Sequence, residues 1–529
     1  MRPPARPDRP APVSPSAPRP PARQFPPSAA QVSPAAGPAR GRGRAPAHAL
    51  GATGPGRAPD PGPAPGRASE RPPRRRRTAI WVSATTVLAL VTTAAGLVVF
   101  KPGPVRDWLG EPQPPPAAAK PPPPPRPVLA AATSGEAPTS DGIAAEIDAL
   151  VRDSRVGDLS VSVADVETGD QLYARDAGAP VIPASVTKLV TGVAVLAARG
   201  PTHRLTTRVL AGSEPGEVVL VGAGDPTLAV DKKGAYDDAA RLDELAAEVR
   251  KQLGDVAPTR VLVDSSVFTG DSIGPGWPSD TANSGYAGHI SGLMVNGGRI
   301  HPQQRSPRST QPDLAAGRRF AALLGLPADA VRAGAAADGA EELGAVESPP
   351  MLRLVEIMIT RSDNVVAEAL ARQVALARQA EPSFAGGAEA TIDVLGELGL
   401  PTDGIQLSDG SGLSRDNRLT TSLMTSLLAL AAGDEHPALS GVFTGLAVAG
   451  YSGTLHDRFV GDTTSAAAGL VRGKTGTLNG VSALTGVVVD ADGRLLAFSL
   501  IANNAPGGLG AAEPLLDRVA ARLAACGCR

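Results

Sequence analysis

Residues 183–199 read PASVTKLVTGVAVLAAR, and this stretch decides how the rest of the sequence is interpreted. Pro183 suits the first turn of a helix, and the apolar residues after it recur at helical spacing. Ser185 and Lys188 are three residues apart, so they lie on one face of the predicted helix. A serine hydroxyl needs an adjacent base to become a good nucleophile, and a buried lysine with a lowered pKa can be that base. The pair indicates a nucleophilic serine, although a lysine on a surface helix gives the same short pattern.

Two further short motifs follow along the chain, and together with the first they indicate one active site. Residues 362–364 read Ser-Asp-Asn and lie between two helical patterns, 351–360 and 365–376, where a short loop can point into a cleft. Residues 474–477 read Lys-Thr-Gly-Thr and precede two predicted strands, where a lysine can project from an edge strand. A polar loop or a turn with a surface lysine would explain either motif alone. All three in this order are improbable by chance.

The three motifs resemble those of the penicillin-recognising serine D-alanyl-D-alanine peptidases. More specifically, the chain is similar to the penicillin-binding protein 4 type, which has a large insertion between the first two motifs. The segment VGAGDPTL at 221–228 resembles a Gly-Gly-Asp-Pro-Thr segment of that family, with Ala223 in the glycine run, and SDGSGLSR at 408–415 matches the segment after the second motif. Other stretches that fit are 263–268, 274–277 and 286–296. The resemblance extends over about 138–505.

This resemblance implies a role for each motif residue in cleaving a D-Ala-D-Ala bond. Ser185 would attack the carbonyl and form an acyl-enzyme, Lys188 would take its proton, and Ser362 would relay a proton to the leaving amine. Lys474 would supply positive potential, and the backbone N–H groups of Ser185 and Thr477 would form the oxyanion hole. Further implied contacts are the substrate backbone for Asn364 and the terminal carboxylate for Thr475 and Thr477.

Four more residues complete the set of candidates. Gly476, which has no side chain, would let a substrate backbone approach closely. Asp409, Ser411 and Ser414 are secondary candidates, which either line the cleft or form a buried structural turn. The six histidines show no metal-ligand spacing, so neither a metal nor a cofactor is expected.

The strand and helix patterns of the folded part predict an α+β fold. Residues 159–166 with 171–174 read as one hairpin, and 481–489 with 494–502 as another; a helix is predicted at 511–525. Strands at both ends with helices between them suggest an antiparallel sheet flanked by helices. The resemblance implies that this is the serine β-lactamase/DD-peptidase-like arrangement. Ser185 and Ser362 are 177 residues apart, far more than a class A β-lactamase needs. We therefore expect an inserted β-containing domain at 206–345, between peptidase segments 136–205 and 346–529.

The N-terminal part has a different composition from the folded part. Residues 1–77 are rich in proline and hold 15 Arg against three acidic residues, a net charge of +12, which predicts a disordered basic tail. Residues 78–100 are uncharged and long enough for one transmembrane helix. The arginines before this run place the tail in the cytoplasm and the rest of the chain outside. A cleaved signal peptide, giving a secreted protein, is the alternative. Residues 101–135 read as a Pro-rich linker.

The charge of the folded part excludes one class of partner. The whole chain carries −1 and residues 101–127 carry +2, which leaves −15 for residues 128–529. An acidic folded part is not expected to bind nucleic acid. Its two cysteines, Cys526 and Cys528, could pair in a small ring or stay free.

The sequence thus predicts a membrane-anchored, extracytoplasmic serine-type D-Ala-D-Ala carboxypeptidase, with D,D-endopeptidase activity as a second possibility. Its expected partners are peptidoglycan stem peptides, inhibitory β-lactams and, through one helix, the membrane. Two alternatives stay open. One is a non-catalytic protein on the same scaffold that binds peptidoglycan or senses β-lactams, and the other is a β-lactamase.

Overall fold

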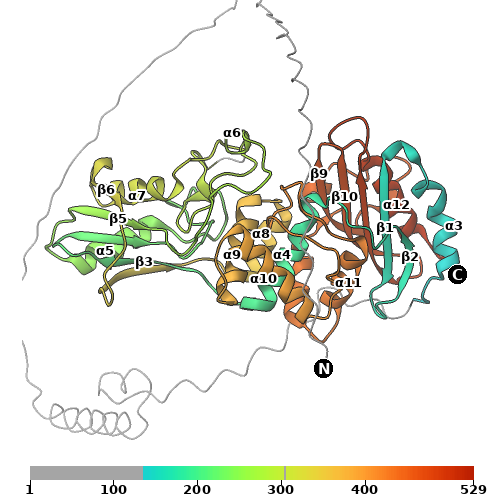
Figure 1. Ribbon diagram of the computed structural model, residues 1–529, viewed down its shortest axis with the longest axis horizontal. Helices are drawn as coiled ribbons and strands as arrows, with labels where there is room; N and C mark the ends of the chain where they lie inside the picture. The colour runs from blue at the N-terminus through green and yellow to red at the C-terminus, as the bar shows by residue number, and fades with distance from the viewer. Residues whose placement is uncertain (1–134, 303–304) are drawn as a thin grey trace, which may run out of the picture. The chain divides into compact units, whose positions relative to one another are not determined.

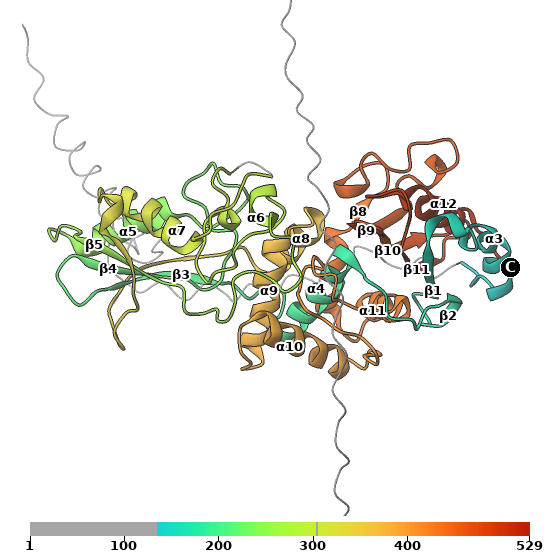
Figure 2. The ribbon, with the colours of Figure 1, turned by 45° about the horizontal axis from the view of Figure 1, so that its top comes forward.

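The computed structural model describes residues 135–302 and 305–529 (Figures 1 and 2). The predicted basic tail, the predicted transmembrane helix and nearly all of the predicted linker therefore lie outside the described residues. Within the described ranges, no helix combines the length and the apolar character that crossing a bilayer requires.

A six-stranded antiparallel sheet forms one part of the molecule, with strand order β2-β1-β11-β10-β9-β8. Its strands are β1 (Asp158–Asp165), β2 (Gln171–Arg175), β8 (Ala447–Val448), β9 (Val471–Leu478), β10 (Val481–Val489) and β11 (Leu495–Asn503). Both predicted hairpins are confirmed, since β1 pairs with β2 and β10 pairs with β11. The continuous apolar runs of β10 and β11 bury their side chains on both faces, so the sheet needs cover on each side.

Helices supply that cover (Figure 1). On one face, α3 (Ser140–Val151) and α12 (Glu513–Ala525) pack in a shared apolar cluster with strand residues such as Phe498 and Leu500. On the other face lies α11 (Thr421–Ala432). The helix predicted at 511–525 is thus present from Glu513 onward.

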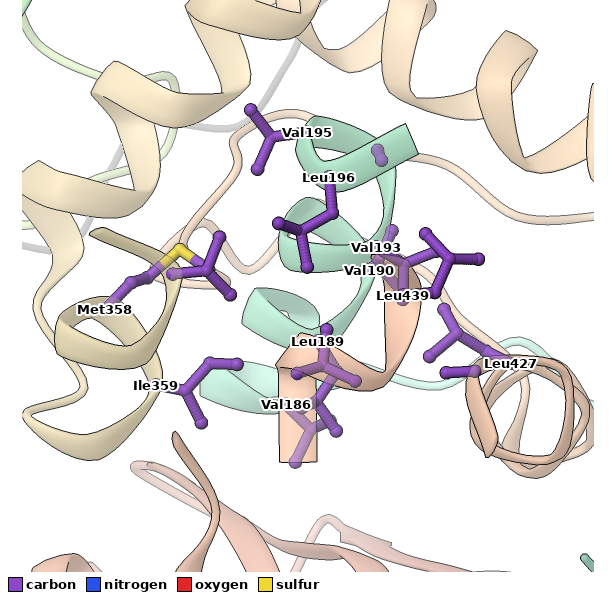
Figure 3. Packing of buried hydrophobic residues seen from close by; sticks show 14 of the residues in the cluster. Val186, Leu189, Val190, Val193, Val195, Leu196, Met358, Ile359, Leu427 and Leu439 are labelled. Carbon is purple, nitrogen blue, oxygen red and sulfur yellow. The ribbon is translucent and has the colours of Figure 1, made fainter. Parts of the chain in front are cut away.

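A group of helices carries the first two motifs. It consists of α4 (Thr187–Arg199), α8 (Met351–Thr360), α9 (Asn364–Ala377) and α10 (Phe384–Glu397). Helix α4 is buried nearly all round, as expected from its apolar sequence. Figure 3 shows Leu189 and Val193 of α4 among Met358 of α8, Leu427 of α11 and Leu439. This packing fixes α4, and with it the residues at its N-terminal end.

A second sheet is formed by the region between the first two motifs, with strand order β6-β5-β4-β3-β7. Its strands are β3 (Thr206–Ala211), β4 (Glu217–Val221), β5 (Arg260–Asp264), β6 (Val331–Ala333) and β7 (Glu342–Glu347). Strand β4 pairs in parallel with β5, and β5 with β6, so the sheet is mixed. Helices α5 (Leu242–Leu253) and α7 (Pro312–Leu323) pack on it around a core of its own, and α6 (Thr281–Ser284) lies in the loops. We call residues 206–347 the inserted region.

Short 3₁₀ turns join these elements: η1 (Ser154–Val156), η2 (Ala184–Val186), η3 (Asn296–Gly298), η4 (Ala328–Ala330), η5 (Pro437–Gly445), η6 (Gly453–Leu455) and η7 (Ser465–Ala467). The ends of the described chain also meet, because the Thr139 N–H donates to the Cys528 carbonyl at 2.7 Å. Cys526 and Cys528 are paired with each other.

Candidate active site

Ser185 lies in a turn before α4, and this differs from the prediction that the helix includes it. The turn η2 holds Ser185, and the α-helix begins at Thr187. At Ala184, the residue before Ser185, φ is 51°, in the left-handed region, so the backbone enters this turn from a non-helical conformation. Strained backbone of this kind is often found at functional sites. The turn sets Ser185 at the start of a rigid, buried helix.

Lys188 lies one turn further along and is fully buried. Its Nζ donates to Ser185 Oγ at 3.0 Å, to Asn364 Oδ1 at 2.6 Å and to the Ser411 carbonyl at 2.7 Å. Burial lowers the pKa of Lys188 to about 8, although the nearby carboxylates Asp409, Glu368 and Asp363 act in the opposite direction. A lysine with this pKa is neutral in a useful fraction of molecules near neutral pH.

The second and third motifs meet through another lysine and serine. Lys474 Nζ donates to Ser362 Oγ at 2.9 Å and to the Thr475 carbonyl at 2.7 Å. Burial, and then the positive charge of Lys188, hold the pKa of Lys474 well below its usual value. Ser362 has a φ of 51°, so its backbone is also in the left-handed region. The structure therefore brings two serine hydroxyls together with two buried lysines, which suits nucleophilic attack and proton relay.

Strand β9 carries the third motif along an open side of the sheet. It pairs with β10 along its length, with Lys474 opposite Thr485, but β8 reaches only Arg472 and Gly473. Residues 474–477 thus leave one side of β9 without a strand partner in the described part of the chain. This position agrees with the prediction that the lysine projects from an edge strand.

Gly476 lies in close contact with another part of the protein. A Cβ at this position would lie 2.9 Å from the Pro183 carbonyl oxygen and 3.1 Å from Ala184 Cβ. The close neighbour of Gly476 in the structure is thus the turn that carries Ser185, and the approach of a substrate backbone stays a prediction. The glycine lets the sheet edge and the nucleophile turn lie in contact.

The two threonines of the third motif both have partners inside the protein. Thr475 Oγ1 donates to Thr454 Oγ1, and Thr477 Oγ1 donates to Glu513 Oε1, each at 2.8 Å. The Thr477 hydroxyl, which the resemblance assigns to binding the substrate's carboxylate, is therefore hydrogen-bonded to the Glu513 carboxylate of α12.

The secondary candidates form a buried turn behind Lys188. Asp409, Ser411 and Ser414 are all buried, and the Asp409 carboxylate accepts the N–H groups of Gly412 and Ser414. Of the two readings of this segment, the buried turn is the one that the structure favours. Its contribution to the site is the Ser411 carbonyl, which accepts a hydrogen bond from Lys188.

Sequence reasoning missed the residues that hold these parts in place. Glu368 accepts the N–H groups of Gly410 and Ser411, both at 2.9 Å, and burial together with Asp409 raises its pKa to about 7. Glu368 follows Asn364 by four residues on α9, and this helical spacing was a usable signal.

Residues of the inserted region were missed as well. Arg299, Arg308 and Tyr236 surround Asp363, and the Trp277 indole donates to Asp409 Oδ2 at 2.8 Å. Trp277 ends one of the stretches that fit the resemblance, 274–277, but no local pattern joins Arg299, Arg308 or Tyr236 to the motifs. Within residues 135–302 and 305–529, no group of His, Cys, Asp and Glu is arranged to hold a metal ion.

Comparison with known proteins places this geometry in a family. Residues 143–308 and 301–523 match the D-Ala-D-Ala carboxypeptidase 3 (S13) family. A carboxypeptidase of Mycobacterium tuberculosis is 39% identical over 409 residues, which cover 76% of this chain and 87% of that protein. Carboxypeptidase DacB of Mycolicibacterium smegmatis is 38% identical over 466 residues, covering 87% of this chain and 99% of that protein.

Solved structures give the same result for the fold. The crystal structure of penicillin binding protein 4 from Haemophilus influenzae matches with a TM-score of 0.59 at 20% identity, over 71% of this chain and 97% of that chain. The same protein complexed with a β-lactam matches with a TM-score of 0.53. The predicted sheet-and-helix fold is thereby confirmed for the described residues.

Proposed function

The chain belongs to the D-Ala-D-Ala carboxypeptidase 3 (S13) family and is a D-alanyl-D-alanine carboxypeptidase, and we propose that Ser185 is its nucleophile. The observation that carries this assignment is the 3.0 Å hydrogen bond between Ser185 Oγ and the buried Lys188 Nζ. The serine has its base in contact, and the base has the lowered pKa that proton abstraction near neutral pH requires.

Acylation then proceeds as follows. Ser185 Oγ attacks the carbonyl carbon between two D-Ala residues, and its proton passes to neutral Lys188. The backbone N–H groups of Ser185 and Thr477 stabilise the negative oxygen of the tetrahedral intermediate. When the C–N bond breaks, the leaving D-Ala amine takes a proton from the Ser362 hydroxyl, which Lys188 and Lys474 replenish. Water hydrolyses the resulting ester and regenerates Ser185.

Substrate binding uses the edge of β9 and the second motif. Asn364 holds the substrate backbone, and Lys474, Thr475 and Thr477 hold its terminal carboxylate, with the Thr477 hydroxyl exchanging Glu513 for substrate. The substrate is the stem peptide of peptidoglycan. A β-lactam, whose strained amide takes the place of the scissile bond, acylates Ser185 and inhibits the enzyme.

The location of the enzyme follows from the sequence before residue 135. The uncharged run at 78–100, preceded by Arg74 to Arg77, anchors the protein as a single-pass membrane protein. The basic tail then lies in the cytoplasm and the catalytic part lies outside, where peptidoglycan is. A protease added to intact cells tests this, because it degrades the catalytic part and leaves the tail intact.

Intact-mass measurement of the full chain after exposure to penicillin tests the nucleophile. We expect one penicilloyl adduct per chain, absent in Ser185→Ala, and release of D-Ala from a stem-peptide mimic. No adduct on the wild-type chain would overturn the assignment. An adduct without D-Ala release would indicate a β-lactam sensor, and rapid turnover of penicillin would indicate a β-lactamase.

A further inference from the structure

Asp363, the middle residue of the second motif, has no part in the reaction steps, although it lies between two residues that do. It caps α9 by accepting the N–H groups of Val365 at 3.0 Å and Val366 at 3.3 Å through Oδ1. On one side is Ser362, with its left-handed backbone, and on the other is Asn364, which contacts Lys188. The position of Asp363 therefore determines where both neighbouring side chains point.

The other carboxylate oxygen of Asp363 is held by the inserted region. Arg299 Nη2 donates to Oδ2 at 2.8 Å and the Tyr236 hydroxyl donates to it at 2.9 Å. Arg308 lies 3.8 Å from Oδ1. The Arg299 side chain is 8% exposed, that of Arg308 2% and that of Asp363 3%, so these are buried ion pairs.

The three partners are themselves fixed within the inserted region. Arg299 also donates to the Tyr236 hydroxyl at 2.6 Å, and its guanidinium lies 5.1 Å from the centre of the Tyr236 ring. Arg308 donates to the carbonyls of Gly285 and Gly297. Burial alone would raise the pKa of Asp363, but Arg308 and Arg299 hold it well below its usual value, so the carboxylate stays charged.

A second contact links the inserted region to the same motif. Asn364 Nδ2 donates to the Tyr286 carbonyl at 3.1 Å, which leaves Asn364 Oδ1 facing Lys188 Nζ. The backbone of the inserted region thus fixes which end of the amide the lysine meets. Asp363 and Asn364, the two residues that follow Ser362, are thus both bound by residues of the inserted region.

We propose that the inserted region positions the second motif for catalysis through Asp363, with Arg299, Arg308 and Tyr236 as positioning residues. This inference rests on the proposed function of Ser185 and Ser362. Buried ion pairs seldom add much net stability, because desolvation of the charges offsets their attraction, but they fix geometry and are costly to break on one side. Here the geometry they fix is that of Ser362 and Asn364.

The test compares single-turnover acylation of the full chain by a chromogenic β-lactam in three variants. Arg299→Met removes the ion pair, and Arg299→Lys keeps the charge but loses the planar fork of donors. The matched control is Arg208→Met, which breaks an exposed ion pair with Glu342 elsewhere in the inserted region. A single-turnover rate constant reports only on competent molecules, so partial misfolding lowers the amplitude and leaves the rate constant unchanged.

We expect the acylation rate constant to fall by about 10²-fold in Arg299→Met, as for a displacement of about 1 Å at a reacting group. Arg299→Lys should recover part of this loss, and Arg208→Met should acylate like the wild type. Acylation of Arg299→Met at the wild-type rate would overturn the inference and leave the proposed function intact. Absence of acylation in the wild type would instead overturn the proposed function.

A pH profile of Asp363→Asn gives a readout that a structural role alone would not change. Asparagine keeps the helix cap but removes the charge. Three titratable carboxyl groups, Asp363, Glu368 and Asp409, act on the pKa of Lys188, and Lys188 in turn acts on the pKa of Lys474. Arg299 and Arg308 lie against Asp363 and keep their positive charge in this variant. Because Asp363 raises the pKa of Lys188, its loss should move the rising limb of acylation to lower pH. Acylation of Asp363→Asn at the wild-type rate over the whole pH range would contradict the inference.

Discussion

Two clusters of buried ionisable groups meet at the second motif, and they differ in their hydrogen-bond partners. One contains Lys188 and Lys474, and the other contains Asp363. Lys188 and Lys474 donate their hydrogen bonds to neutral oxygens of serine, asparagine and backbone carbonyl groups. Asp363 is instead held by the guanidinium groups of Arg299 and Arg308. Both clusters are removed from water, so burial penalises charge in each.

The difference in partners leads to opposite chemistry. Neutral acceptors do not compensate the buried ammonium groups, so the pKa values of both lysines fall and protons can leave and return. The arginines compensate Asp363 fully, so its charge is fixed over the whole working range of pH. In the functions proposed above, the lysine cluster transfers protons and the Asp363 cluster holds Ser362 and Asn364 in position.

Removal of Lys188 should have the largest effect. We expect Lys188→Met to lower the acylation rate constant by about 10²- to 10⁴-fold, the usual contribution of a general base. Its unfolding temperature should change little, because loss of the donor to Asn364 and Ser411 is offset by removal of a buried charge. Acylation by penicillin and thermal unfolding measure the two quantities. Acylation within tenfold of the wild type would show that the lysine cluster is not the proton-transfer site.

The second effect is on stability, and it concerns the other cluster. Arg299→Met should lower the free energy of unfolding by about 3 kcal/mol, because Asp363 stays buried with one partner fewer. Denaturant unfolding followed by circular dichroism measures this. Arg208→Met, which breaks an exposed pair, should cost less than about 1 kcal/mol. Equal losses in the two variants would remove the distinction between buried and exposed pairs.

The third prediction is the pH dependence of acylation. Lys188 must be neutral to accept the proton, and its pKa is lowered to about 8. The rate constant should therefore rise about tenfold per pH unit below that value and level off above it. Stopped-flow measurements with a chromogenic β-lactam between pH 6 and 9 follow the rise. A flat profile would mean that Lys188 is already neutral at pH 6 or takes no proton.

The smallest effect is expected at Trp277, the third contact from the inserted region. Trp277→Phe removes the hydrogen bond from the indole to Asp409, which should cost about 1.5 kcal/mol in unfolding free energy. The acylation rate should fall less than in Arg299→Met, because Ser414 still donates to the same carboxylate oxygen. A larger fall in rate than in Arg299→Met would make the turn behind Lys188 the dominant support.

The elements that the sequence predicted correctly depend on local pattern. The hairpin predicted at 481–502 appears as β10 and β11, and the helical patterns flanking the second motif appear as α8 and α9. Turn residues and helical periodicity determine local structure over a few neighbouring positions, so they can be recognised in a single sequence. The predicted start of α4 was wrong by two residues, because an alanine in the sequence gives no indication of a positive φ such as that of Ala184.

The candidate active site was also predicted only where the sequence pattern is local. The three motifs could be found because each is a short run of residues. The residues that hold the motifs in place could not be found in this way. Arg299 lies 64 residues from Asp363 and Tyr236 lies 127 residues away, and an arginine or tyrosine in a loop usually faces water. The contact of Gly476 with Pro183 and Ala184 could not be predicted either, because it joins segments that are almost 300 residues apart in the sequence.

The pairing of β1 with β11 has a consequence for how the protein is made. Asp158 of β1 pairs with Asn503 of β11. One edge of β1 therefore stays unpaired until β11, one of the last strands in the sequence, has been synthesised. During synthesis, almost the whole catalytic part leaves the ribosome while β1 still has an unpaired edge. Contacts this distant in sequence close slowly and leave the growing chain open to aggregation. The catalytic sheet is therefore complete only after β11 has been made, so a chain that stops before Asn503 lacks the finished sheet.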